Sequence, residues 1–330
     1  MNLSKYIKNK RSKISFVLLM LMLFISLFAE IIANDKPIVV KYDGQYMFPI
    51  VKVYTDARFG GDFPTEANYK DPLIKENINE DGFMIMPLIE FSYNTVDYEL
   101  NEPFPASPSS RHPLGTDEEG RDILARLLYG IRLSFLFSLM LTIISSVIGI
   151  SVGAIQGYYG GKTDIVLQRI IEIWDAMPQM FVLIIVASVF VPSFFTLLFI
   201  LLLFSWSELT GLVRAEFLRA RNFEYVKAAK ALGVSNFRII WRHILPNALV
   251  TTVTFVPFIL AGGIVALTAL DFLGLGLGYE YPSLGDLVRQ GKDNLHAPWI
   301  GLSVFFVLSM LLSSLIFIGE GVRDAWDKRK

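Results

Sequence analysis

The chain has 330 residues, of which 53% are apolar and 18% are charged, whereas about 25% are charged in an ordinary soluble domain. Its 30 Lys and Arg balance 31 Asp and Glu, so the charge balance favours neither nucleic acid nor an acidic ligand as a partner. The chain contains no cysteine, which excludes disulfides, thiolate metal sites, iron–sulfur clusters and a cysteine nucleophile. Its three histidines, at positions 112, 243 and 296, are too far apart in sequence to suggest a metal site.

The apolar residues are concentrated in windows that contain no Asp, Glu, Lys or Arg: Ile14–Ala29, Leu133–Gly161, Ala176–Ser207, Ala248–Leu270 and Ala297–Gly319. A helix needs about 20 apolar residues to cross the hydrocarbon core of a bilayer. The third window is divided by Pro192, because proline does not continue a helix. The pattern therefore predicts an all-α polytopic membrane protein with six transmembrane helices, near residues 14–33, 133–157, 177–191, 194–213, 249–270 and 298–319.

The first span is either an uncleaved anchor or a cleaved signal peptide. Basic residues precede it in both cases, but Glu30-Ile-Ile-Ala-Asn-Asp after it offers no clear small-x-small cleavage site, which favours the anchor. Further basic residues lie between spans two and three, between spans four and five, and after span six. Because basic loops stay in the cytoplasm, we expect both termini on that side and residues 34–132 outside.

We expect three parts: 1–34 with the cytoplasmic tail and first helix, an extracytoplasmic insert at 35–113, and a five-helix core at 114–330. The insert carries 13 acidic and 7 basic residues and nine prolines, together with many aromatic residues. It contains too many apolar side chains for a disordered linker, and Val39–Tyr42, Met47–Tyr54 and Phe83–Phe91 resemble short extended segments. It is either a contact surface for a delivered ligand or its carrier, or a lid without a role in recognition.

An amphipathic helix is expected between the insert and span two. Thr116 and Glu119 have the spacing of a capping box, and Ile123, Leu124, Leu127 and Leu128 recur at helical spacing. The acidic residues 117–119 would then lie at the positive end of the helix dipole, with metal binding as the less favoured alternative.

Two glycine-rich segments fail as nucleotide sites. Gly157-Tyr-Tyr-Gly-Gly-Lys-Thr has three residues, rather than four, between its first Gly and the Gly-Lys-Thr, and it follows a membrane span instead of a strand. Gly274-Leu-Gly-Leu-Gly is not a dinucleotide fingerprint. We find no ordered Ser/His/Asp set and no paired carboxylates, so we expect neither catalysis nor a cofactor.

The loop at 214–246 predicts a helical hairpin. Asn222 would cap a first helix whose apolar face is Tyr225, Ala228, Ala229 and Leu232, and Gly233 would end it in the left-handed conformation. Ser235 would cap a second helix, with the face Phe237, Ile240, Trp241 and Ile244, before Pro246 enters span five. The hairpin either packs only on its own bundle or docks on a cytoplasmic partner.

This loop resembles the EAA loop of ABC importer permeases. Ala228-Ala229, Gly233 and Leu245-Pro246 match the family pattern, whereas Lys227 replaces its Glu and His243 its Ile. Tyr225–Ala229, Arg242–Asn247, His112–Asp117 and Gly157–Asp164 are similar to the C-type, or second, permease of the dipeptide/oligopeptide/nickel family. The enlarged insert is similar to that of the microcin C/oligopeptide-type branch. The resemblance implies an ATPase-docking loop composed of Glu224, Tyr225, Lys227, Ala228, Ala229, Leu232, Gly233, Phe237, Trp241, His243, Leu245 and Pro246.

The resemblance also implies partners in a bacterial inner membrane. These are a homologous B-type permease that forms a heterodimer with this chain, two cytoplasmic ATP-binding subunits and an extracytoplasmic solute-binding protein. The cargo would be a peptide or peptide-like compound, with nickel complexes and opines as alternatives. A stand-alone secondary transporter or channel is the competing class. It is disfavoured because ion-coupled transporters carry ionisable groups within their spans, and we expect Glu30, Glu208 and Asp271 to lie near span ends.

Overall fold

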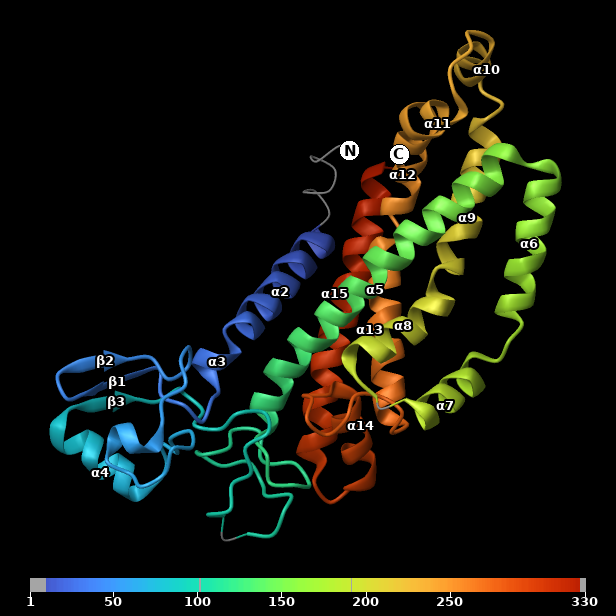
Figure 1. The fold of residues 1–330 in the computed structure, drawn as a ribbon. Helices are drawn as coiled ribbons and strands as arrows, with labels where there is room; N and C mark the ends of the chain where they lie inside the picture. The colour runs from blue at the N-terminus through green and yellow to red at the C-terminus, as the bar shows by residue number, and fades with distance from the viewer. Residues whose placement is uncertain (1–9, 101, 191, 327–330) are drawn as a thin grey trace. The chain divides into compact units, whose positions relative to one another are not determined.

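The computed structural model describes residues 10–100, 102–190 and 192–326, and helices predominate in it (Figure 1). The chain divides into two compact units. Unit 1 comprises the described parts of residues 1–19, 135–278 and 311–330, and unit 2 comprises residues 20–134 and 279–310.

The helices in chain order are α2 (Lys10–Leu27), α3 (Ala29–Ile32), α4 (Pro72–Asp81), α5 (Ile123–Tyr159), α6 (Gly161–Asp175), α7 (Gln179–Val189), α8 (Phe194–Ser205), α9 (Ser207–Ala220), α10 (Glu224–Ala231), α11 (Asn236–Arg238), α12 (Leu245–Val253), α13 (Val256–Phe272), α14 (Leu284–Asp293) and α15 (Pro298–Trp326). A short 3₁₀ helix, η1, covers Asp56–Phe59, and a π-helical turn, η2, covers Ile239–Ile244.

A small antiparallel sheet forms the insert within unit 2, with strand order β2-β1-β3. The strands are β1 (Val39–Tyr42), β2 (Gln45–Met47) and β3 (Phe83–Ile85). The predicted strand at Val39–Tyr42 is confirmed. The predicted extended segment at Met47–Tyr54 is wrong, because β2 ends at Met47 and the chain turns at Phe48, whose carbonyl accepts from the Val51 amide at 3.0 Å. A two-residue turn at Asp43-Gly44 joins β1 to β2. Both turn residues have positive φ, as a tight hairpin turn requires.

Helix α4 packs on this sheet and closes a small core in unit 2 (Figure 1). Pro72 opens the helix, and the Asp71 carboxylate caps it by accepting from the Leu73 amide at 2.8 Å. The core consists of Val40, Met47, Phe59, Ala67, Tyr69, Ile74 and Ile78. The insert is therefore an ordered mixed α/β element in a chain that is otherwise helical.

No separate amphipathic helix precedes span two, because α5 is continuous from Ile123 to Tyr159. The predicted capping box at Thr116 is wrong. The Thr116 hydroxyl accepts from the Ala106 amide at 2.8 Å, and Asp122 caps the helix by accepting from the Ala125 amide at 2.8 Å. The helix extends into unit 2 because partners from the same unit neutralise its charged first turns, as described below.

Each of the six predicted spans falls on helices: α2–α3, α5, α7, α8–α9, α12–α13 and α15. Among the described residues, three helical stretches are long and apolar enough to cross a membrane: Ile123–Tyr159, Phe194–Ala220 and Pro298–Ala325. The break between α7 and α8 falls at Pro192, as predicted. The third predicted span falls on α7, and α6 precedes α7 across non-helical residues at Ala176–Pro178.

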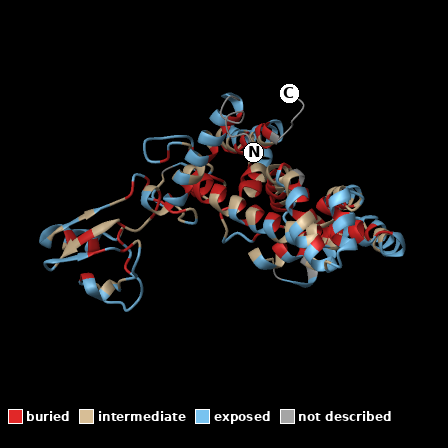
Figure 2. Ribbon diagram, turned by 90° about the horizontal axis from the view of Figure 1, so that it is seen from above, coloured by how far each residue is buried: buried red, intermediate tan, exposed pale blue. Residues whose placement is uncertain are grey.

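Helices α5 and α9 approach each other closely within unit 1. Gly149, Gly153 and Gly157 lie four residues apart on α5, and a Cβ atom on any of them would lie within 2.6 Å of α9. Small residues at this spacing let two membrane helices come into backbone contact. Many other helix positions are exposed (Figure 2), including large apolar side chains such as Phe199, Phe305 and Phe306, as expected of a surface in contact with lipid.

Candidate functional site

A helical hairpin follows α9 in unit 1, with α10 as its first arm and α11 and η2 as its second (Figure 1). Gly233 joins the arms with φ of +77°, and the Val234 amide donates to the Ala229 carbonyl at 3.1 Å. This is the left-handed helix end predicted for Gly233. The predicted cap at Asn222 is wrong, because its amide donates instead to the Leu218 carbonyl at 3.1 Å.

The inner face of the hairpin is fixed to unit 1. Val226 and Ala229 of α10 and Ile239 and Ile244 of η2 are buried in one apolar cluster. The same cluster includes Phe217 of α9 and residues from α5 and α12. Because both arms contribute to this cluster, the hairpin is held as one body with the ends of three longer helices.

The hairpin also carries exposed apolar side chains, on both arms. Tyr225 is 43% exposed, Leu232 83%, Phe237 71% and Trp241 55%, and Ala228 is exposed among them. We call these five residues the hairpin face. The predicted apolar face on α10 is therefore correct for three residues and wrong for Ala229, which points inward. On the second arm, Ile244 is likewise buried.

The other predicted site residues have different environments. Glu224 and Lys227 form an exposed ion pair at 3.0 Å, so Lys227 already has an acidic partner on its own helix. His243 is half-buried and Leu245 is buried in the core of unit 1. Pro246 is exposed in the first turn of α12, directly after η2. The wider π-helical turn accommodates the missing proline amide without ending the helix.

The segment Gly157-Tyr-Tyr-Gly-Gly, rejected as a phosphate loop, supports this hairpin. Tyr158 donates its hydroxyl hydrogen to the Asn236 Oδ1 atom at 2.7 Å, at the start of α11. Arg214 of α9 forms a bidentate ion pair with Asp164 of α6, in which its two nitrogens donate to the two carboxylate oxygens at 2.6 and 2.8 Å. The four-residue spacing of Gly149, Gly153 and Gly157 is the sequence signal for the close helix contact beneath this hairpin.

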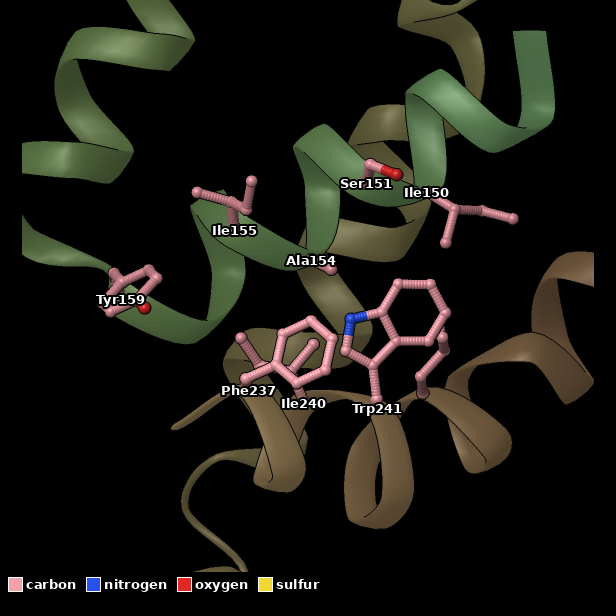
Figure 3. Close-up of a pocket in the computed structure, with 9 residues that line it drawn as sticks. Ile150, Ser151, Ala154, Ile155, Tyr159, Phe237, Ile240 and Trp241 are labelled. Carbon is pink, nitrogen blue, oxygen red and sulfur yellow. The ribbon is translucent and has the colours of Figure 1, made fainter. Parts of the chain in front are cut away.

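An apolar groove of about 340 Å³ separates the second arm from the end of α5 (Figure 3). Phe237 and Trp241 lie on one side and Ser151, Ala154 and Ile155 on the other. The groove leaves both aromatic side chains room to move, which suits a surface that adapts to a partner.

A second cluster of charges fastens the start of α5 in unit 2. Asp117 accepts from Arg121 Nε at 2.8 Å and also pairs with Arg126, whose second nitrogen lies 3.0 Å from Asp286 of α14. Burial alone would raise the pKa of Asp286, but Arg126 and Arg289 hold it below the ordinary value. The acidic residues 117–119 thus form ion pairs: Arg121 also pairs with Glu119, and Arg289 with Glu118. They neither cap a helix as predicted nor, within the described residues, join a group of three or more metal ligands.

His112 lies between two buried carboxylates in unit 2. Its Nδ1 is 2.8 Å from Asp122 and its Nε2 is 3.1 Å from Asp97. Burial alone would lower the pKa of His112, but the two hydrogen bonds and the nearby negative charges outweigh burial and raise it. This arrangement ties residues 97–112 to the cap of α5.

Comparison with known proteins extends these observations. The model for the inner membrane component of binding-protein-dependent transport systems matches residues 145–330, which include the hairpin. The chain is 51% identical to the inner membrane ABC transporter permease protein YejE of Escherichia coli, over 99% of this chain and 96% of that protein. It is 50% identical to the peptidoglycan transport system permease protein YejE of Agrobacterium fabrum, over 98% and 91%.

More distant relatives share the same architecture. The oligopeptide transport system permease protein OppC of Lactococcus lactis is 31% identical, over 81% of this chain and 99% of that protein. A chain of the inward-facing MetNI methionine ABC transporter superposes with a TM-score of 0.53 at 18% identity, over 62% of this chain and 97% of that chain. The insert lies outside the residues that the family model matches.

These matches define the class: a multi-pass inner-membrane permease subunit of an ABC importer, which is not itself an enzyme. The chain belongs to the family of inner membrane components of binding-protein-dependent transport systems. Similarity to the YejE and OppC permeases places it with the peptide-transport permeases, consistent with the C-type branch. Membership of this family implies another permease subunit and ATPase subunits as partners.

Proposed function

We propose that this permease imports peptides or peptide-like compounds, with its translocation path at the seam with a homologous B-type permease. The names of its relatives refer to oligopeptide, dipeptide and peptidoglycan transport, which favours this cargo over nickel complexes or opines. In this proposal the chain crosses the membrane six times with both termini in the cytoplasm, in the three parts predicted from its sequence.

The hairpin face is the proposed ATPase dock. Its exposed aromatic and aliphatic side chains are the single observation that carries this proposal, because a cytoplasmic apolar surface of this kind requires a partner to cover it. The buried inner face connects the dock to α5, α9 and α12. Closure of two ATP-binding subunits would therefore move the hairpin and these helix ends together.

The insert is the proposed contact surface for a delivered ligand or its carrier protein. A cavity of about 510 Å³ in unit 2 is lined by charged and aromatic residues, among them Lys70, Phe91 and Arg111. The Lys70 ammonium lies 3.5 Å from the centre of the Phe91 ring. Burial is the main reason that the pKa of Lys70 lies below its ordinary value. Four carboxylates, those of Asp35, Asp71, Asp97 and Glu99, also line this cavity, so its charge favours a cationic group over an anionic one.

The test is ATP-driven uptake of a short peptide by the complete transporter in proteoliposomes. The proposal requires uptake that depends on ATP, on both permeases and on the ATPase subunits. Uptake that continues after the ATPase subunits are omitted would instead indicate a stand-alone channel or secondary transporter. Failure of any peptide to enter, with a different solute entering on ATP, would overturn the peptide assignment.

A further inference from the structure

One acidic residue lies within a long apolar helical stretch. Glu208 belongs to the helical stretch Phe194–Ala220, which is long and apolar enough to cross a membrane. It precedes Arg214 by six residues, about 9 Å along a helix. Arg214 is already paired with Asp164.

The Glu208 carboxylate borders a small polar cavity in unit 1. The cavity has a volume of about 140 Å³, and its polar lining consists of Gln179 of α7, Ser205 of α8 and Glu208 itself. The remaining lining includes Gly262 and Gly263 of α13. Glu208 is exposed and, within the described part of the chain, forms no hydrogen bond or ion pair.

A break between two helices lies beside this cavity. Helix α6 ends at Asp175 and α7 begins at Gln179, so the backbone between them is not helical. Trp174 holds this break against α8 by donating to the Leu203 carbonyl at 2.7 Å. Irregular backbone at membrane depth is tolerated where protein covers it or where it borders a water-filled cavity. The exposed side chains of Asp175 and Gln179 at the break favour the second situation.

The two charged side chains in this region, Glu208 and Asp175, are both acidic. Asp175 lies close enough to Glu208 for the two carboxylates to interact electrostatically, and no described basic residue pairs with either of them. Two carboxylates without a counterion in a membrane-spanning region are unfavourable unless a cation reaches them. The site is therefore complementary to a positively charged group that is not part of this chain.

We propose that Glu208, with Asp175 beside it, binds the ammonium group of the cargo as the cargo passes through the membrane. Because the cavity holds only a small group, it suits one primary ammonium, such as a peptide N-terminus or a lysine side chain, and not a whole peptide. This inference deepens the proposed function and rests on it for the identity of the cargo. A basic residue of the partner permease is the alternative source of the cation, and the experiment separates the two.

The transport test uses the complete transporter in proteoliposomes, with trialanine and N-acetyl-trialanine as probes. Glu208→Gln is expected to raise the KM for trialanine about tenfold, as loss of one charge-assisted contact would, and to leave the acetylated peptide unchanged. Glu216→Gln on the same helix is the matched control and should change neither. Equal losses for both peptides, or weaker association with the partner permease, would overturn the proposal in favour of a contact between subunits.

A second measurement does not depend on peptide import. Because the chain has no cysteine, Ser205→Cys introduces a unique thiol at the cavity. A cationic thiosulfonate reagent is expected to modify it several-fold faster than an anionic one, and Glu208→Gln in the same chain should remove most of that preference. No modification, or a preference that Glu208→Gln leaves intact, would overturn the proposed site even in a transporter that imports peptides normally. The expected preference in a transporter that imports no peptide would overturn only the proposed cargo.

Discussion

Gly153 of α5 faces the Thr210 carbonyl of α9 so closely that a Cβ atom on the glycine would lie 2.6 Å from that oxygen. Gly149 has the same relationship to the Trp206 carbonyl at 2.5 Å, and Gly157 to the Arg214 carbonyl at 2.6 Å. These contacts continue to the base of the hairpin, where Arg214 and Tyr158 hold α6 and α11. The close helix pair therefore forms the support on which the proposed dock rests.

Gly153→Leu is predicted to destabilise the permease. The new side chain would force α5 and α9 apart, and overpacking of this kind costs about 1–3 kcal/mol. The thermal midpoint of the purified permease, followed by fluorescence-detected size exclusion, measures the loss. Gly211→Leu is the control, since nothing lies within 4 Å of a Cβ atom at that position on α9. An equal midpoint shift in both variants would show that the close approach is not what stabilises the pair.

Gly233→Val is predicted to uncouple ATP hydrolysis from uptake while the protein still inserts and assembles. At φ of +77° a β-branched residue is strained, by at least the ~1–2 kcal/mol that the left-handed region costs an ordinary L-residue. The surrounding space is open, so the strain lies in the backbone of the hairpin and not in packing.

The measurement is the ratio of peptide molecules taken up to ATP molecules hydrolysed in proteoliposomes. Gly233→Asn is the comparison, because asparagine tolerates the left-handed conformation better than valine. A normal ratio in Gly233→Val would contradict the assignment of Gly233 to the coupling element.

The positions of the membrane spans were predictable from the sequence because each depends on about 20 neighbouring apolar residues. The start of α5 was not, because Arg126 and Arg132 there are neutralised by Asp117, Asp286 and Glu30, and two of these lie about a hundred residues or more away in the chain. Such pairing is invisible to a local hydropathy pattern.

The hairpin shows a different limit of sequence analysis. Its helical spacing and the glycine at its turn were local signals, and Gly233 has the predicted conformation. Which face points outward depends on Phe217 and Tyr158, whose packing against the hairpin is set by the tertiary fold. Ala228 and Ala229 therefore look equivalent in the sequence, although only Ala229 is buried.

Ala228→Arg is predicted to prevent ATPase subunits from co-purifying with the permease. Ala228 is exposed within the hairpin face, so the fold tolerates the larger side chain while a closely packed partner does not. Recovery of the ATPase should fall about tenfold or more, as at other interface centres. Asn222→Arg places the same charge at an exposed position before α10 and outside the hairpin face, and it should leave recovery unchanged if the hairpin face is the dock. Equal recovery with both variants would show that the ATPase binds elsewhere.

Residues 97–122 are predicted to become less stable as the pH rises. The carboxylates of Asp97 and Asp122 raise the pKa of His112 above its ordinary value, which is about 6.5. Asp97 also accepts from Arg111, at 3.0 Å, and the Phe91 ring packs against the His112 ring. A raised folded-state pKa contributes stability that is complete below pH of about 6.5 and disappears as the pH passes through the folded-state pKa.

Hydrogen exchange of the whole permease in nanodiscs, corrected for the intrinsic effect of pH, measures this change. Protection of residues 97–122 should fall between the ordinary histidine pKa and the higher value in the fold, and His112→Asn should abolish the step. His296→Asn removes an exposed histidine of the same unit and should leave the step in place. A step that survives in His112→Asn would assign the pH dependence to another group. Protection that rises with pH would contradict the raised pKa itself, because the protonated histidine would then destabilise the two-carboxylate site that it now holds together.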